Sequence, residues 1–287
     1  NGLHAVFKDA DWDRLILDAR LSNHFLKTLT RWVKFLGSLS SLAALSLDTD
    51  EVLMLYLNDI RDYYYQFLVS PERAKRNAID FTLTPDEAKR FQAFSSLDPE
   101  QKEAASYVPG FGSLAMGDTN AVEFGQVSHV GIGCQAGAIF EDEVLTGYHP
   151  LPRGAYMTGV TLDDSLGLER EKAMSASRTA SGRVTAFPFP SAPASAIAGA
   201  RFSLFEAGIS KHNLSVHPTK GLKRVSEGVG WGGQFNGTEG WLRAPVNRCI
   251  ALAHVTIQVA RLGFATVTML ETLSGSWVSV LIYCRRC

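Results

Sequence analysis

Residues 159–164 read Gly-Val-Thr-Leu-Asp-Asp, a strand-like run that ends in two adjacent carboxylates. β-branched residues favour strands, and short polar side chains favour tight turns. We therefore predict a β-hairpin that carries Asp163 and Asp164 at its tip. An Asp-Asp pair in a loop can equally be a solvated turn without function, and the pair alone leaves that alternative open.

A second acid follows another apolar run. Residues 51–57 (EVLMLYL) are almost continuously apolar, which predicts a buried strand, and Asn58-Asp59 comes directly after it. A carboxylate at the end of a buried strand is costly unless it is paired or binds a cation. Converging carboxylates are hard oxygen ligands that suit Mg²⁺, and two such ions catalyse in-line phosphoryl displacement. This pattern favours Asp59, Asp163 and Asp164 as a two-metal site.

The rest of the pattern mixes helices and strands in an α+β order. We predict a strand at 12–17, mostly helix at 24–47, a helix start at Thr84-Pro85, a helix within 120–140, partial helix in the basic segment 201–224, a hairpin at 228–241 and two apolar helices in 246–282. Ala, Ser, Pro and Gly fill 18 of the 26 positions from 175 to 200. That composition predicts a linker or a surface insertion.

Charge is divided unevenly along the 287 residues, although the net charge is only −1. Residues 1–164 contain 14 Lys and Arg against 23 Asp and Glu, a net of −9, and residues 165–287 contain 14 against 6, a net of +8. An acidic half joined to a basic half is consistent with a polyanionic ligand approached by two different surfaces. The most apolar run, 32–47, contains Lys34 and is too short to span a bilayer.

The four cysteines and seven histidines indicate no metal centre of their own. Cys284 and Cys287 have CxxC spacing but no second pair nearby, so a reducing, intracellular location (cytoplasmic or nuclear) is the expectation. His129, His212 and His217 lack metal-ligand spacing, and we predict surface or satisfied polar roles for them.

Three stretches together suggest a family. They are Asp59-Ile-Arg-Asp-Tyr-Tyr-Tyr-Gln-Phe, Leu114-Ala-Met-Gly-Asp-Thr-Asn-Ala and Thr161-Leu-Asp-Asp. In this order and spacing they resemble the first, second and third motifs of reverse transcriptases, above all the form in gypsy-like retroelements. Further similarities are Lys8 with Arg14-Leu-Ile-Leu-Asp-Ala-Arg for the fingers, His217-Pro-Thr-Lys for the lysine turn, Gly230-Trp-Gly-Gly-Gln-Phe for the primer grip and Leu242-Arg-Ala-Pro for the thumb start.

The resemblance implies a right-hand polymerase fold with fingers, palm and partial thumb. The implied parts are fingers at 1–50 and 73–106, palm at 51–72 and 107–237 with the insertion at 175–200, and thumb with the start of the connection at 238–287. The implied activity is RNA-directed DNA synthesis by a retrotransposon enzyme. Its partners are an RNA or DNA template-primer duplex and a dNTP, with no membrane, and further domains of a pol polyprotein outside this chain.

The resemblance also implies a role for each matching residue. Asp59, Asp163 and Asp164 hold two Mg²⁺ ions, with Mn²⁺ as a substitute, and Ile60 offers one ion its backbone carbonyl. The implied nucleotide-binding residues are Lys8, Arg14, Tyr64, Met116 and Gly117. The implied primer and template contacts are Lys220, Lys223, Arg224, Trp231 and Gly232. Packing roles remain the alternative for the tyrosines at 63–65 and for Trp231.

Two departures from the family pattern support a different hypothesis. Ala115-Met116 replaces the usual Pro-Gln or Pro-Phe of the second motif, and Asp118 adds a charge close to the nucleotide site. The alternative is a decayed or domesticated reverse-transcriptase-like protein that binds nucleic acid without polymerising. A third reading, a two-metal phosphohydrolase of unrelated fold, explains neither the fingers nor the primer-grip match.

Overall fold

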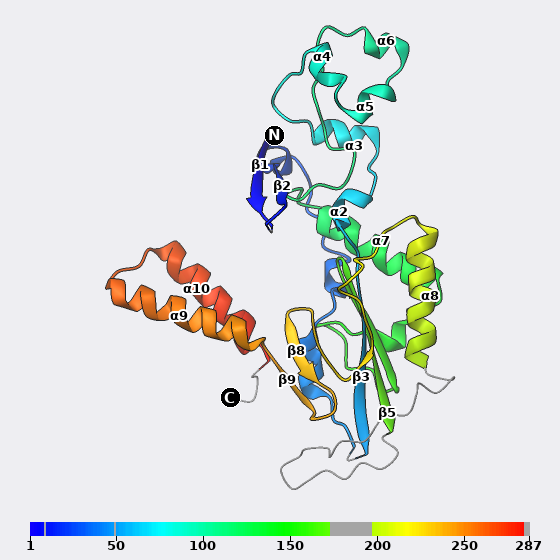
Figure 1. Cartoon of the computed structure of the whole chain (residues 1–287), viewed down its shortest axis with the longest axis vertical. Coiled ribbons are helices and arrows are strands. Elements are labelled where there is room, and N and C mark those ends of the chain that lie inside the picture. The colour runs from blue at the N-terminus through cyan, green and yellow to red at the C-terminus, as the bar shows by residue number, and fades with distance from the viewer. Residues whose placement is uncertain (9, 49, 173–196, 284–287) are drawn as a thin grey trace. The chain divides into compact units, whose positions relative to one another are not determined.

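The structure is a computed structural model and describes residues 1–8, 10–48, 50–172 and 197–283 (Figure 1). The chain divides into two compact units that alternate along the sequence. Unit 1 comprises residues 1–31 and 62–125, and unit 2 comprises residues 32–61 and 126–287.

A four-stranded antiparallel sheet forms the centre of unit 2, with the strand order β4-β5-β3-β6. The strands are β3 (Glu51–Asp59), β4 (Tyr156–Thr161), β5 (Asp164–Lys172) and β6 (Leu222–Val225). Every residue of β3 after Glu51 is buried. The strand is paired on both edges and covered on both faces, and its near-continuous apolar run reflects that position. The predicted strand at 51–57 is thus confirmed, and it extends to Asp59.

Helices α7 (Ala121–Gln135) and α8 (Ile197–Lys211) flank this sheet, and Figure 1 shows α8 alongside β3 and β5. Phe202 of α8 packs in a buried cluster with Tyr56 and Tyr156, and the ring centroids of Tyr56 and Phe202 are 5.5 Å apart. Neighbouring strand residues point to opposite faces, so Leu55 and Leu57 face a second cluster that includes Phe235. Helix and cluster together exclude water from both faces of the sheet.

The other described elements of unit 2 are a small sheet, a pair of helices and three short 3₁₀ helices. These elements are β7 (Glu227–Gly230), β8 (Gly233–Asn236), β9 (Trp241–Arg243), α9 (Val246–Leu262), α10 (Val267–Leu281), η1 (Val33–Phe35), η2 (Leu39–Ala44) and η3 (Glu141–Glu143). The indole N–H of Trp277 donates to the Thr256 hydroxyl at 2.9 Å and joins α10 to α9. The predicted hairpin at 228–241 and the two apolar helices in 246–282 are confirmed.

Unit 1 consists of one β-hairpin and several short helices. Its elements are β1 (Gly2–Phe7), β2 (Asp13–Asp18), α1 (Arg20–His24), α2 (Tyr63–Gln66), α3 (Pro71–Arg76), α4 (Pro85–Ala88), α5 (Gln92–Ser95) and α6 (Pro99–Lys102). β2 confirms the predicted strand at 12–17. Its residue Leu17 is buried against Ile79 and Ala115, so the hairpin and the second-motif segment share a core.

A buried ion pair fixes the second-motif segment inside unit 1. Both carboxylate oxygens of Asp118 accept from the Arg73 guanidinium at 2.6 Å, and the two side chains are only 1% and 17% exposed. The guanidinium also lies 4.6 Å from the centre of the Phe124 ring. The extra charge of Asp118 is therefore neutralised within its own unit.

Two predictions about secondary structure need correction. Residues 24–47 are not mainly α-helical: the segment holds the short 3₁₀ helices η1 and η2, and between them Leu36 bridges Val160 and the Gly37 N–H donates to the Val160 carbonyl at 2.8 Å. The helix start at Thr84 is correct and has a full capping box, but the first helix already ends at Ala88. Residues 197–200 belong to α8 rather than to the predicted insertion, whose residues 175–196 lie outside the described ones.

The division into fingers, palm and thumb stays a prediction, as does the right-hand arrangement. The chain passes from one unit to the other at 31/32, 61/62 and 125/126. The predicted boundaries between fingers and palm fall instead at 50/51, 72/73 and 106/107. Asp59 and Ile60 thus lie in unit 2, and Tyr64 lies in unit 1.

We expect Asp118→Asn to lower the free energy of unfolding of this protein by about 3 kcal/mol, because it leaves the Arg73 guanidinium buried without its counter-charge. Urea denaturation measures the change. The control is Asp86→Asn, which removes an exposed pair with Lys89 and is expected to change little. Equal losses in the two variants would contradict a buried role for the Arg73–Asp118 pair.

Candidate functional site

The hairpin predicted from residues 159–164 is present. Thr161 at the end of β4 pairs with Asp164 at the start of β5, so Leu162 and Asp163 form the two-residue turn. Leu162 has φ +54°, in the left-handed region that a residue with a β-carbon rarely adopts. This turn places Asp163 at the tip and Asp164 at the first position of β5.

The strand register brings the third carboxylate to the same end of the sheet. β3 and β5 pair in unbroken register from Glu51 opposite Lys172 to Asp59 opposite Asp164. One residue further, the Ile60 N–H donates to the Asp163 carbonyl at 2.8 Å. Asp59, Asp163 and Asp164 therefore lie together, as the prediction requires, and all three belong to unit 2.

The concentration of carboxylates changes the acidity of one of them. Burial, together with the charges of Asp163 and Asp59, raises the pKa of Asp164 to about 7, and Lys220 acts in the opposite direction. The Lys220 ammonium donates to the Asp59 carboxylate at 3.0 Å. The site therefore holds more negative charge than a single lysine offsets, and a further cation would stabilise its ionised form.

The donors suit Mg²⁺ chemically, because three carboxylates are hard oxygen ligands and they lie at one end of the sheet. Within the described ranges, however, no three His, Cys, Asp or Glu side chains are grouped so as to hold a metal ion. The Asp59 carboxylate bonds Lys220 instead. The two-metal assignment accordingly remains a prediction.

Two buried side chains of α7 bond the backbone of the turn. The amide oxygen of Gln126 accepts from the Leu162 N–H at 3.0 Å, and its amide nitrogen donates to the carbonyls of Val160 at 2.9 Å and Phe35 at 3.1 Å. His129 Nδ1–H donates to the Leu162 carbonyl. Both side chains are 0% exposed. Burial lowers the pKa of His129 to about 4, so its imidazole is neutral at pH 7.

A hollow of about 420 Å³ opens beside Asp163 and Asp164. Its lining includes Asp163, Asp164, Trp231 and Gly232, together with Arg248. Trp231 and Gly232 form the two-residue turn between β7 and β8, and both have positive φ as a type I′ turn requires. The structure thus brings the predicted primer-grip turn to the carboxylate site.

The indole ring of Trp231 packs into the sheet core. It is partly buried against the main cluster of unit 2, and a β-carbon added at Gly159 would stand 2.5 Å from the ring and 2.9 Å from the Leu145 carbonyl. The Tyr283 hydroxyl donates to the Trp231 carbonyl at 3.3 Å. The packing alternative therefore fits the ring, and Trp231 and Gly232 both line the hollow.

The predicted nucleotide-binding residues all lie in unit 1. Gly117 has φ +105°, and a β-carbon there would stand 1.9 Å from the Leu17 carbonyl oxygen. The Met116 carbonyl accepts from the Leu17 N–H at 2.9 Å. The glycine is thus required by contact with β2, and its role toward a nucleotide stays a prediction.

The other members of this set differ in their contacts. The Lys8 ammonium pairs with Asp62 at 3.2 Å, and Arg14 is exposed on β2. Tyr64 is half-buried, with its ring centre 5.3 Å from that of Tyr63. Tyr63 is buried, which fits its packing alternative. None of these contacts tests the predicted roles.

Two of the residues that were predicted to bind phosphate form ion pairs with acidic side chains. Lys223 pairs with Glu206 at 2.9 Å, and Arg224 pairs with Glu171 at 2.7 Å. Glu171 lies near the end of β5 that is opposite to Asp164. Only Lys220 of the predicted basic residues lies at the carboxylate site, and phosphate binding by the other two remains a prediction.

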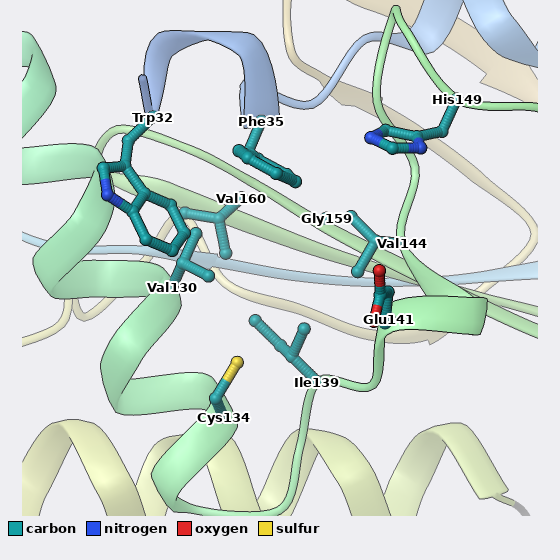
Figure 2. Close-up of a pocket in the computed structure, with 10 residues that line it drawn as sticks. All are labelled: Trp32, Phe35, Val130, Cys134, Ile139, Glu141, Val144, His149, Gly159 and Val160. Carbon is teal, nitrogen blue, oxygen red and sulfur yellow. The ribbon is translucent and has the colours of Figure 1, made fainter. Parts of the chain in front are cut away.

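Figure 2 shows a second hollow of about 270 Å³, between η1, α7 and β4. Its walls are mainly apolar: Trp32 and Val160 line it, and Phe35 stacks on His149 with ring centres 5.7 Å apart. Glu141 is the one carboxylate among its lining residues. This hollow lacks the convergent acids of a two-metal site, and Gln126 bonds the backbone of Phe35 and Val160 in its wall.

Sequence reasoning missed the contribution of four residues. Gln126 and His129 bond the turn, and Arg248 and Tyr283 line the hollow beside it. The signal for the first two was weak but present: they are three positions apart within a predicted helix and therefore share one face. Arg248 lies on α9 and Tyr283 follows the C-cap of α10, and no local pattern relates them to the hairpin.

The described helices include none that is both long enough and apolar enough to cross a membrane. The expected intracellular location stays a prediction.

Comparison with solved structures gives a likeness of fold. A foamy viral protease–reverse transcriptase in complex with double-stranded DNA matches 96% of this chain and 41% of its own length, with a TM-score of 0.53 and 12% identity. Its dRH form with double-stranded DNA matches equally well over 34% of that chain. A Candida albicans telomerase with telomeric RNA has a TM-score of 0.38. No protein-family model and no curated protein matches the sequence.

The chain therefore has a reverse-transcriptase-like, polymerase-type fold. It spans only about a third to two fifths of the length of the viral proteins it matches, and at 12% identity the likeness concerns the fold alone.

We expect Gly159→Ala to lower the free energy of unfolding by about 2 kcal/mol, because the new methyl group displaces the Trp231 ring or the Leu145 backbone. Chemical denaturation with Trp fluorescence measures the loss. Gly131→Ala on α7 is the control, since a β-carbon there meets nothing within 4 Å. A loss as large in the control would show that the packing against Trp231 is not the cause.

The low pKa of His129 predicts a loss of stability in acid. The unfolded chain takes up a proton near pH 6.5 and the folded chain near 4, so the free energy of unfolding falls by roughly 3 kcal/mol from pH 7 to pH 4. Asp164, whose pKa is raised, works in the opposite direction over much of this range. The contribution of His129 is therefore measured as the difference between wild type and His129→Asn, whose amide keeps a donor but does not titrate. Parallel pH profiles would contradict the assignment.

Proposed function

We propose that this chain is a template-directed nucleotidyltransferase, most specifically an RNA-directed DNA polymerase of a retrotransposon. One observation supports this above the others: the β3–β5 register and the β4–β5 turn bring Asp59, Asp163 and Asp164 to the same end of the sheet. The polymerase-type fold agrees with that chemistry, and the viral proteins it resembles were solved with double-stranded DNA.

Asp59, Asp163 and Asp164 would hold two Mg²⁺ ions, for which Mn²⁺ can substitute, with the Ile60 carbonyl as a further ligand. When bound, such ions lower the pKa of an attacking hydroxyl and neutralise the charge that develops on the leaving phosphate. The chain itself would supply the carboxylates, two in the β4–β5 turn region and the third on β3 opposite Asp164. Lys220, which bonds Asp59 at 3.0 Å, is placed to release that carboxylate and meet a phosphate oxygen instead.

The primer is proposed to enter the 420 Å³ hollow, where its 3′-hydroxyl would approach Asp163 and Asp164. Trp231 and Gly232 would position the primer end through their backbone, because the Trp231 ring is packed into the core. Lys223 and Arg224 would bind template or primer phosphates only after giving up Glu206 and Glu171.

For the dNTP we propose the residues of unit 1. Arg14 is exposed and its guanidinium can take two phosphate oxygens, whereas Lys8 acts as a point charge. Tyr64 would exclude a 2′-hydroxyl, and Met116 and Gly117 would contact the nucleotide. Catalysis in this proposal is positioning together with charge neutralisation.

A second candidate function is a reverse-transcriptase-like protein that binds nucleic acid without polymerising. It is favoured by the lysine bonded to Asp59 and by the lack of a preformed group of three metal ligands in the described part of the chain. The ion pair of Asp118 with Arg73 removes one argument for it, since that charge is neutralised.

Primer extension on poly(rA)/oligo(dT) with Mg²⁺ and dTTP separates these functions. We expect extension by the wild type and a loss of about 100-fold or more in Asp163→Asn, because a neutral amide cannot replace a carboxylate ligand. Asp142→Asn, which removes an exposed acid outside the site, is the matched control. Duplex binding without extension would support the second candidate, and neither binding nor extension would refute both.

A further inference from the structure

Two buried polar side chains of α7, Gln126 and His129, bond the backbone of Leu162 in the β4–β5 turn. Leu162 immediately precedes Asp163 and has φ +54°. Both of its backbone polar groups are bonded by one helix: its N–H donates to Gln126 and its carbonyl accepts from His129. The two-residue connection from Thr161 to Asp164 requires a positive φ at its first position, which is costly for a leucine, and these two bonds help to offset that cost.

We infer that Gln126 and His129 are positioning residues, which hold the Leu162 turn so that the Asp163 and Asp164 carboxylates converge on Asp59. We call this pair of residues the turn clamp. The inference rests on the proposed function for its kinetic consequences but not for its structural ones.

The geometry of α7 suits this role. Gln126 and His129 are three residues apart and therefore lie on the same helix face, both 0% exposed. Gln126 bonds three backbone groups at once, those of Phe35, Val160 and Leu162. It thereby ties the strand before the turn, and not only the turn, to the helix.

The opposite side of the turn is held by the sheet. The Asp163 carbonyl accepts from the Ile60 N–H at 2.8 Å, and the Thr161 hydroxyl donates to the Gly37 carbonyl at 3.0 Å. The residues on both sides of Leu162 are thus held by hydrogen bonds, and the conformational freedom that remains is that of the Leu162 backbone, which the turn clamp restricts. Errors of about 1 Å in the position of a catalytic group can reduce rates about 100-fold, so this freedom matters for activity.

The test uses variants that remove the bonds while filling the space. Gln126→Met has no donor or acceptor of comparable strength, and His129→Leu cannot donate. We expect each to lower kcat about 10- to 100-fold with KM for dTTP changed less than about threefold, because positioning affects the transition state more than substrate binding. Mn²⁺ affinity, measured by electron paramagnetic resonance, is expected to fall about 10-fold, as is usual for groups that orient metal ligands.

Two further variants separate positioning from general stability. Thr158→Val removes a buried hydroxyl that donates to the Leu166 carbonyl in the same hairpin, away from the turn, and is expected to leave kcat and Mn²⁺ affinity unchanged. His129→Asn keeps an N–H donor at the position of Nδ1 and is expected to recover activity to within about threefold of wild type. Equal kinetic losses in Thr158→Val and Gln126→Met would overturn the inference.

A double variant tests the mechanism directly. Glycine adopts positive φ without cost, so adding Leu162→Gly to Gln126→Met is expected to restore part of the lost activity and metal affinity. Losses that simply add would contradict a clamp on φ.

Crystal structures of wild type and Gln126→Met give a readout that does not require polymerase activity. We expect the Leu162–Asp163 turn to move by about 1 Å or more in the variant, and an unmoved turn would overturn the inference. If the wild type neither polymerises nor binds Mn²⁺, the proposed function fails while this structural comparison still decides on the clamp.

Discussion

The antiparallel pairing of β3 with β5 is the constraint on which the site depends. Nine residue pairs in unbroken register run from Glu51–Lys172 to Asp59–Asp164. A shift of one residue would turn every side chain of β5 to the other face and would separate the carboxylates. The register is strongly specified because β3 is buried between α8 on one face and the leucine-rich cluster on the other. Hydrophobic burial thereby determines the position of charged groups that are costly to place together.

This position creates an electrostatic repulsion that protonation of Asp164, the Lys220 ammonium or a further cation can relieve. The pKa of Asp164 rises to about 7 because burial and two neighbouring carboxylates oppose its ionisation. Lys220, which forms an ion pair with Asp59, supplies one positive charge to the site. The same packing that excludes water strengthens both the repulsion and the attraction. A site of this kind suits a substrate and ions that bring charge of their own, which agrees with phosphoryl chemistry more closely than with a passive polar turn.

Much of the local structure and the choice of acids could be predicted from the sequence. The apolar run of β3, the β-branched approach to Asp163, the capping box at Thr84 and the glycine-rich hairpin at Trp231 act within a few residues, and the structure contains each of them. The prediction failed at 24–47, where the chain forms two short 3₁₀ helices and Leu36, between them, bridges Val160 at an edge of the sheet. Intrinsic propensity is a weak preference, and a backbone partner on a neighbouring strand outweighed it there.

By itself, then, the sequence determined the strands and the turn that carry Asp59, Asp163 and Asp164, because strand and turn preferences are local, while the metal-binding role of these acids stays a prediction. Tertiary structure alone decided which groups meet across long separations. Lys220 bonds a carboxylate 161 positions away, Gln126 bonds a carbonyl 91 positions away, and Arg73 neutralises Asp118 across 45 positions. It also decided that Gly117 is required by Leu17. Such contacts depend on how whole elements pack, and no pattern within one element contains that information.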